Sequence, residues 1–204
     1  MEIFLVRHGQ TDGNVAHRHQ ATDTPLNELG KKQALSAAKT IKELKPTHMV
    51  TSNLVRAIQT AEAIGEACDL IPDTNAVFRE LERPVHLRGH YHRSSRSFLF
   101  YFQWYFRKIK TDKVGGESYD ELLERIDEAK KALAKYPPDA RVVVVSHAVF
   151  ITMFLAHLCR KKPIGIWKAV TTFPKILMIK NTSFVKVNFD TSESGDSCAW
   201  SVDR

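Results

Sequence analysis

Residues 141–147 read Arg-Val-Val-Val-Val-Ser-His, which is the strongest β-strand pattern in the chain. Four consecutive β-branched residues favour an extended backbone. Because no polar residue interrupts the valines, we expect this strand to be buried on both faces, as central strands of parallel sheets are. The strand ends at Ser146 and His147, so a histidine is predicted at its carboxyl end.

A second predicted strand ends in the same way. Residues 2–6 form a short apolar run with β-branched and aromatic side chains, and the run stops at Arg7-His8-Gly9. In parallel α/β sheets, ligands bind beyond the carboxyl ends of the strands. We therefore predict a site where His8 and His147 both lie.

Helical patterns alternate with the predicted strands. Asn27 can start a helix that runs to about residue 44, and Ser52 or Asn53 can cap a helix with Leu54, Ile58, Ala61 and Ile64 on its inner face. The other predicted elements are a strand at 48–51, a helix from a Ser118–Glu121 capping box to Leu133, an apolar helix from 148 to about 159, and a hairpin of strands 183–189 and 199–202 joined across Gly195-Asp196. This order predicts a three-layer α/β/α sandwich with a mostly parallel central sheet.

Length and composition limit the classes of protein to consider. A chain of 204 residues with 43% hydrophobic and 26% charged residues fits one globular α/β domain spanning 1–204. No apolar run reaches the roughly 20 residues that a membrane span needs, so we expect no membrane partner. Cys68, Cys159 and Cys198 are far apart, which argues against a disulfide or zinc framework and for a cytoplasmic protein.

The positive charge is concentrated in one segment. Residues 83–113 contain eight Lys and Arg residues and one acid, Asp112, so this insert carries the whole formal net charge of +7. Ser94 or Ser95 can cap a helix in it, with Phe98, Phe102, Tyr105 and Ile109 on one inward face. A regional basic patch suits an anionic ligand.

Four motifs follow one another along the chain: residues 5–11 with Asn14, residues 52–62, residues 79–81, and residues 144–148. Each stands in the expected strand or helix context. Jointly they resemble the phosphoglycerate mutase-like branch of the histidine phosphatase superfamily, as does the turn at residues 24–30. The resemblance covers most of the chain but is poor from about 83 to 114. It implies the phosphoglycerate mutase-like sandwich, with 83–113 as a helical lid or specificity region.

The resemblance also implies site residues, and their chemistry fits those roles. His8 would be the nucleophile that takes the phosphoryl group. Arg7, Arg56 and His147 would neutralise phosphate oxygens, and Arg56 falls in a first helical turn where backbone N–H groups also favour anions. The acid that protonates the leaving group would be Glu80, with Glu82 as the competitor. The implied substrate-binding residues are Asn14, Gln20 and Arg83.

Three positions depart from the family pattern without removing a catalytic group. Gln10 stands where many relatives have Glu, and Ala148 follows His147 where Gly is common. Ala21 follows Gln20 where Gly is usual, which can reshape the loop over the phosphate. No cofactor is implied, and the spacing of His86, His90 and His92 matches no metal-ligand motif.

Several functions remain open from the sequence. The first is a phosphomonoesterase that acts on a small phosphorylated metabolite, and the nearest alternative is mutase-type transfer to a second hydroxyl. The second class is a non-catalytic phosphate-binding module, and the third is a nucleic-acid binder that uses the basic insert, which the sequence does not favour. For the insert itself, the options are a lid, a basic lip for a second acidic group, or a partner surface. The sequence specifies no oligomeric state, and a homodimer is compatible with it.

Overall fold

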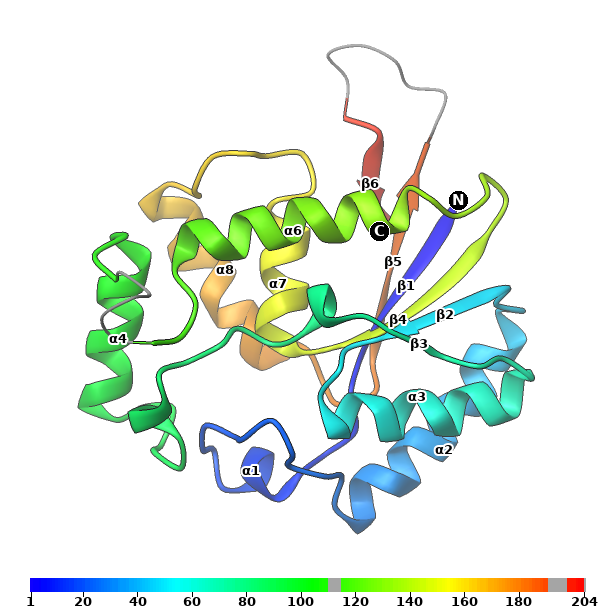
Figure 1. The fold of residues 1–204 in the computed structure, drawn as a ribbon, viewed down its shortest axis with the longest axis horizontal. Coiled ribbons are helices and arrows are strands. Elements are labelled where there is room, and N and C mark those ends of the chain that lie inside the picture. Colours follow the sequence, from blue (N-terminus) through cyan, green and yellow to red (C-terminus); the bar gives the residue numbers. More distant parts are fainter. Residues whose placement is uncertain (110–114, 191–197, 204) are drawn as a thin grey trace.

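The computed structural model of the chain describes residues 1–109, 115–190 and 198–203, with only the backbone of 175–178 (Figure 1). Six strands form one sheet in the order β3-β2-β4-β1-β5-β6 within these residues. Their bounds are β1 Glu2–Arg7, β2 His48–Thr51, β3 Asp73–Thr74, β4 Arg141–Ser146, β5 Phe184–Phe189 and β6 Trp200–Val202. The strands from β3 to β1 are parallel, and β5 is antiparallel to β1 and β6.

Helices cover both faces of the sheet, as the three-layer prediction requires (Figure 1). The helices are α1 Asp12–Val15, α2 Glu28–Glu43, α3 Val55–Cys68, α4 Ser95–Tyr105, α6 Tyr119–Leu133, α7 Ala148–Ala156 and α8 Ile166–Met178, with short 3-10 turns η1 Ala76–Phe78 and η2 Val85–Leu87. Helices α2 and α3 lie on one face, and α6, α7 and α8 lie on the other. None of the helices in the described residues is long and apolar enough to cross a bilayer.

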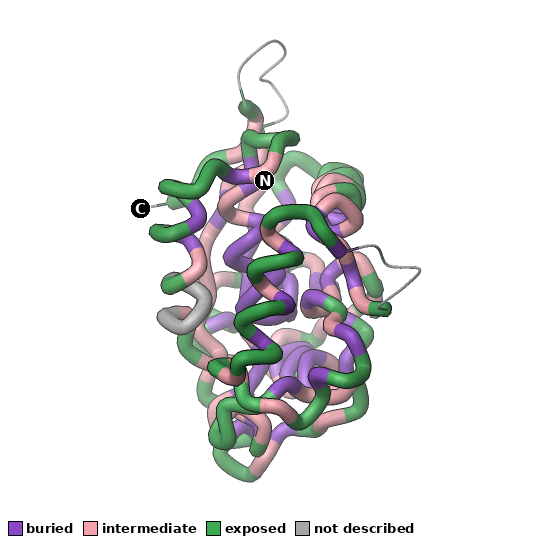
Figure 2. The backbone as a smooth tube through the Cα atoms, turned by 90° about the vertical axis from the view of Figure 1, so that its left-hand side faces the viewer, coloured by how far each residue is buried: buried purple, intermediate pink, exposed green. Residues whose placement is uncertain are grey.

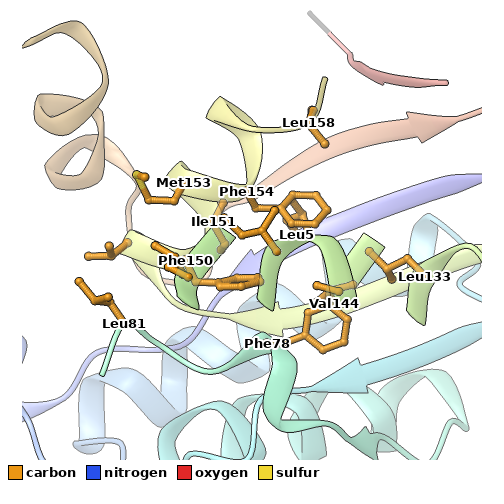
Figure 3. Packing of buried hydrophobic residues seen from close by; sticks show 14 of the residues in the cluster. Leu5, Phe78, Leu81, Leu133, Val144, Phe150, Ile151, Met153, Phe154 and Leu158 are labelled. Atoms are coloured by element: carbon orange, nitrogen blue, oxygen red, sulfur yellow. The ribbon is translucent and has the colours of Figure 1, made fainter. Parts of the chain in front are cut away.

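The alternation of side chains along β1 and β4 produces two cores. Leu5 and Val144 point into the larger core, where Phe78, Phe150 and Phe154 pack (Figure 3). The neighbouring residues along each strand point to the opposite face and pack on small residues of α2 and α3. Buried segments accordingly run through the middle of the molecule, with exposed segments outside (Figure 2). The fold class predicted from the valine run is confirmed.

Local sequence signals predicted most helices correctly, but the predicted start of α3 was wrong. The N-cap is Leu54, whose side chain makes no capping bond. Ser52 lies before the cap, and its hydroxyl is 2.8 Å from the Nε2 atom of His147. On the inner face, Ala61 and Ile64 are buried as predicted, together with Arg56 and Thr60 in place of Ile58. The sequence patterns also missed β3 and α8.

The predicted inner face of the insert helix was wrong for Phe98 and Phe102, whereas Tyr105 packs against the core and Ile109, beyond the end of the helix, is buried as predicted. Helix α4 does begin after a Ser94 cap, but the buried side chains are Ser97, Phe100 and Trp104. Phe98 and Phe102 are exposed. The error arose because α4 is apolar on both sides, so helical periodicity could not identify the side that faces the protein.

Two cysteines predicted to be unpaired form a disulfide. Cys159 follows α7 and Cys198 precedes β6, and their Cα atoms lie 5.5 Å apart. The pairing follows from the fold, because Trp200 packs on Phe154 with ring centroids 5.9 Å apart. Cys68 is free. The cysteine argument for a cytoplasmic location therefore fails. The Gly195-Asp196 connection of the predicted hairpin lies outside the described residues.

The corrected orientation of α4 predicts a stability difference between two aromatic positions. Trp104 is 1% exposed and donates its indole N–H to the carbonyl of Glu117, whereas Phe98 is 72% exposed. We expect Trp104→Ala to lower the free energy of unfolding by about 3–5 kcal/mol. Phe98→Ala should change it by less than about 0.5 kcal/mol. Urea unfolding of both variants measures this, and equal losses would contradict the assignment of the faces.

Candidate active site

The register of two parallel strands brings the two predicted histidines together. Arg7 at the end of β1 pairs with Ser146 at the end of β4. His8 directly follows β1, and His147 directly follows β4. The backbone N–H of His8 donates to the carbonyl of Ser146 at 3.0 Å. As a result, the two imidazole rings lie 5.0 Å apart between centroids, at an angle of 56°.

The His8 ring is held in one tautomer. Its Nδ1 atom lies 2.7 Å from the carbonyl oxygen of Gly9, and because a carbonyl can only accept, Nδ1 carries the proton. The Nε2 atom therefore keeps its lone pair. Burial, followed by the positive charges of Arg56 and Arg7, lowers the pKa of His8 well below 6.5. His8 is thus a neutral imidazole with one nucleophilic nitrogen, and it lines a pocket.

Two guanidinium groups flank His8, of which that of Arg56 is buried and that of Arg7 is half-buried. Arg56, in the first turn of α3, donates to the carbonyl of Ala21 at 3.0 Å. Arg7 donates to the carbonyl of Ile179. The Nε atom of each arginine is buried and has no hydrogen-bond partner in the described structure. Burial lowers the pKa of Arg56 to about 10, which reflects the cost of holding this charge without an anion. Both side chains line the pocket.

Glu80 enters the same pocket from the segment that precedes the insert. Its carboxylate accepts the backbone N–H groups of Val149 and Phe150, at 3.3 and 3.1 Å, in the first turn of α7. It also accepts the N–H of Leu81 at 2.9 Å. Glu82 does not line the pocket; its exposed carboxylate lies 3.6 Å from Arg79. Of the two candidate acids, Glu80 lines the pocket that His8 also lines, and Glu82 does not.

A buried ion pair fixes the backbone around Glu80. Arg125 of α6 contacts both carboxylate oxygens of Glu117 at 2.6 Å. The same guanidinium donates to the carbonyls of Val77 and Arg79 at 2.9 and 2.8 Å, just before Glu80. Glu117 accepts the backbone N–H two residues after Glu80 at 3.4 Å. Since both buried charges are paired and hydrogen-bonded to this loop, they can hold it in one conformation.

His147 lies beside His8 and is itself fully buried. Its Nε2 atom is 2.8 Å from the hydroxyl of Ser52, and its Nδ1 atom has no partner in the described structure. Burial, then the charges of Arg56 and His8, keeps the pKa of His147 well below 6.5. His147 is not among the residues that line the pocket. Direct contact of His147 with phosphate therefore stays a prediction.

The pocket has a volume of about 1190 Å³. The predicted residues Asn14, Gln20 and Arg83 all line it. Gln20 accepts the hydroxyl of Thr11 at 2.8 Å, which fixes the loop that follows β1. The guanidinium of Arg83 donates to the phenol oxygen of Tyr101 at 2.8 Å. Arg83 is thereby held by the insert helix at the pocket wall.

Asn181 is a pocket residue that was not predicted. Asn181 donates to the carbonyl of His8 at 2.9 Å and to the side-chain oxygen of Asn14 at 3.3 Å. It therefore connects the loop before β5 to both of these residues. No sequence pattern pointed to it, because Asn181 stands in a loop without a motif and comes to the site only through the pairing of β5 with β1.

The insert forms one wall of the pocket. Its loop pairs with the loop after α1: the N–H of His19 donates to the carbonyl of His90 at 3.0 Å, and the N–H of His92 donates to that of His17 at 2.9 Å. The pocket-lining residues of the insert are Arg83, Tyr91, His92, Arg93, Ser94, Tyr101 and Trp104. Within the described residues, no three potential metal ligands are grouped.

The sequence model of the histidine phosphatase superfamily (branch 1) matches residues 3–195. The chain belongs to the histidine phosphatase superfamily. A protein named "Probable phosphoglycerate mutase GpmB" from Escherichia coli is 33% identical over 199 residues, which cover 94% of this chain and 86% of the relative. The protein of the same name from Cronobacter sakazakii is 35% identical over 153 residues, 73% of this chain and 70% of the relative.

Solved structures of the superfamily have the same fold. A mycobacterial glucosyl-3-phosphoglycerate phosphatase, determined in complex with VO3, superposes with a TM-score of 0.78 at 28% identity and covers 100% of this chain and 97% of its own. YhfR of Bacillus stearothermophilus, at 21% identity, superposes with a TM-score of 0.76, with coverage of 98% and 94%. This chain is therefore an enzyme of the histidine phosphatase type with a phosphoglycerate mutase-like fold.

The pKa shift of His8 predicts that this histidine stays neutral in mildly acidic solution. A group whose folded-state pKa is lowered binds its proton only below that pKa, so lowering the pH through 6.5 should not protonate His8 in the folded chain. Titration of ¹⁵N-labelled protein followed by NMR of the ring nitrogens measures this. A titration midpoint of His8 near 6.5 would contradict the prediction.

Proposed function

We propose that this histidine phosphatase is a phosphomonoesterase that hydrolyses a small phosphorylated metabolite through a phosphohistidine intermediate. The observation that carries the proposal is the environment of one neutral imidazole. His8 has the lone pair of its Nε2 atom available. Beside it lie Arg7 and Arg56, whose buried Nε–H groups have no partner in the described structure. A phosphomonoester dianion supplies the missing acceptors and the missing negative charge. The same cations stabilise the charge on the transferring phosphoryl group.

In the first step, Nε2 of His8 attacks phosphorus while the bond from phosphorus to the ester oxygen breaks. Glu80, protonated in the substrate complex, gives its proton to the departing oxygen, so an alcohol leaves in place of an alkoxide. Arg7 and Arg56 hold the phosphoryl oxygens. The proton on Nδ1 of His8 stays hydrogen-bonded to the carbonyl of Gly9, which stabilises the positive charge that develops on the ring.

In the second step, water attacks the phosphohistidine. Glu80, now a carboxylate, takes a proton from the water as its oxygen bonds to phosphorus, and the bond from Nε2 to phosphorus breaks. Inorganic phosphate leaves, and both His8 and Glu80 return to their starting states. Asn14 and His147 donate to phosphate oxygens, and Gln20 and Arg83 bind other parts of the substrate.

Mutase-type transfer is the nearest alternative, because the relatives named above include phosphoglycerate mutases. It differs only in the acceptor, a second hydroxyl in place of water. Hydrolysis is favoured by a solved relative that covers the whole chain and is named a glucosyl-3-phosphoglycerate phosphatase. A panel of phosphate esters separates the two: hydrolysis releases one phosphate per ester consumed, and transfer yields an isomer without free phosphate. The presence of both a nucleophile and an acid argues against a non-catalytic module.

The proposed intermediate predicts a covalent label on His8. Rapid quenching with a ³²P-phosphomonoester should give acid-labile label in the wild-type protein and none in His8→Ala, because the variant lacks the proposed nucleophile. His86→Ala is the matched control, since His86 is exposed on η2 outside the pocket, and it should keep the label. Label in His8→Ala, or none in the wild type, would refute the mechanism.

The proposed acid predicts a dependence on the leaving group. Glu80→Gln should slow hydrolysis of alkyl phosphates by about 10²–10⁴-fold, the usual contribution of general acid catalysis. Nitrophenyl phosphate should be affected less, because its leaving group needs little protonation. Glu82→Gln is the control and should change neither rate. Steady-state kcat/KM with both esters tests this, and equal losses on both would remove Glu80 from the role of acid.

A further inference from the structure

Helix α4 has an apolar face that nothing in the described structure covers. Its buried side is formed by Phe100 and Trp104, and the opposite side carries Phe98, Leu99, Phe102 and Phe106. Phe98, Phe102 and Phe106 follow one another at a spacing of four, and Leu99 lies three residues before Phe102, so the four side chains form one stripe. Phe98 is 72% exposed, and the rings of Phe98, Phe102 and Phe106 follow one another at 6.4 and 4.7 Å.

Helix α8 carries a second exposed apolar stripe. It is formed by Ile166, Trp167 and Val170, of which Trp167 is 85% exposed. The two helices lie at the same end of the molecule (Figure 1). They touch through Tyr105, whose hydroxyl donates to the carbonyl of Ile164 at 3.0 Å and whose ring meets Phe173 at 5.9 Å. Half of the large exposed hydrophobic residues of the described structure belong to this α4–α8 face, seven of fourteen.

The segments that form the α4–α8 face carry only positive charges, and Asp120 of the neighbouring α6 forms an ion pair with Arg107 at 2.9 Å. No Asp or Glu occurs between residues 83 and 109 or between 160 and 180. Exposed cations border both stripes: Arg96, Lys108, Lys161, Lys162 and Lys168. An exposed apolar face usually marks a binding surface. This face suits a partner that offers apolar material to its aromatic and aliphatic side chains and negative groups to the flanking lysines and arginines.

We propose that the α4–α8 face binds the surface of an anionic lipid membrane. Aromatic and aliphatic side chains on amphipathic helices insert at the boundary between headgroups and acyl chains, and flanking lysines and arginines attract anionic headgroups. A second copy of this chain is a poorer partner, because a two-fold interface would bring the same cations together. We expected no membrane partner because no segment could span a bilayer, but surface binding needs no spanning segment.

Sedimentation with lipid vesicles tests the proposal on the full chain. The protein should bind vesicles of phosphatidylcholine with phosphatidylglycerol more tightly than vesicles of phosphatidylcholine alone. The double variant Phe98→Ser/Trp167→Ser should bind the mixed vesicles at least about tenfold more weakly, because two large apolar side chains would no longer leave water on binding. The control is Ile71→Ser, which removes a 92% exposed side chain from the segment after α3, outside the α4–α8 face.

Two further measurements separate membrane binding from unfolding and from binding to another partner. The double variant and the control should both keep the melting temperature of the wild type, because the altered side chains are exposed. Fluorescence of the wild type should shift to shorter wavelength with mixed vesicles, and Trp167→Phe should abolish that shift while Trp104 and Trp200 remain. Absence of vesicle binding overturns the proposal. The proposal is also overturned if the wild type self-associates, or binds single-stranded RNA, instead of binding vesicles, and the double variant loses that property.

Discussion

The parallel pairing of β1 with β4 is the constraint on which the site depends. Each strand is buried on both faces, so its register is fixed by side chains packing into two cores at once. A slip of one residue would exchange the two faces of β1 and move polar Arg7 and His8 relative to the end of β4. The register that satisfies the cores also aligns the strand ends, and the two imidazoles meet as a consequence.

The same burial determines the electrostatics of the site. Removing Arg7 and Arg56 from water disfavours their charged forms and lowers the pKa of both, and those charges in turn keep the nearby imidazoles neutral. This arrangement is costly in the free protein, because buried N–H groups remain without acceptors in the described structure. A phosphate dianion in the pocket would supply acceptors for these N–H groups and favour the charged forms of both arginines. The site is therefore organised for its ligand before the ligand binds, at the expense of stability.

The sequence predicted the parts of the molecule where local chemistry and global fold agree. The valine strand, the Ser118 capping box and the histidines at strand ends could be found because each pattern has one physical solution. Predictions failed where two solutions compete. Helix α4 could bury either side, and Ser52 could cap a helix or bond His147. The Cys159–Cys198 pair and Asn181 depend on which distant segments meet, and spacing along the chain carries no information about that.

The insert is linked to the acid as well as to the pocket wall. The indole of Trp104 donates to the backbone of Glu117, Glu117 binds Arg125, and Arg125 holds the carbonyls that precede Glu80. Trp104, Glu117 and Arg125 are all buried, so a displacement of α4 must be accommodated by the loop that carries Glu80. Residues of the insert that face the pocket can vary to suit different substrates, whereas Trp104 cannot be replaced without loosening the support of Glu80. The two faces of α4 are thus under different constraints. The inner face must keep the position of Glu80, and the outer face would be constrained by the proposed membrane contact.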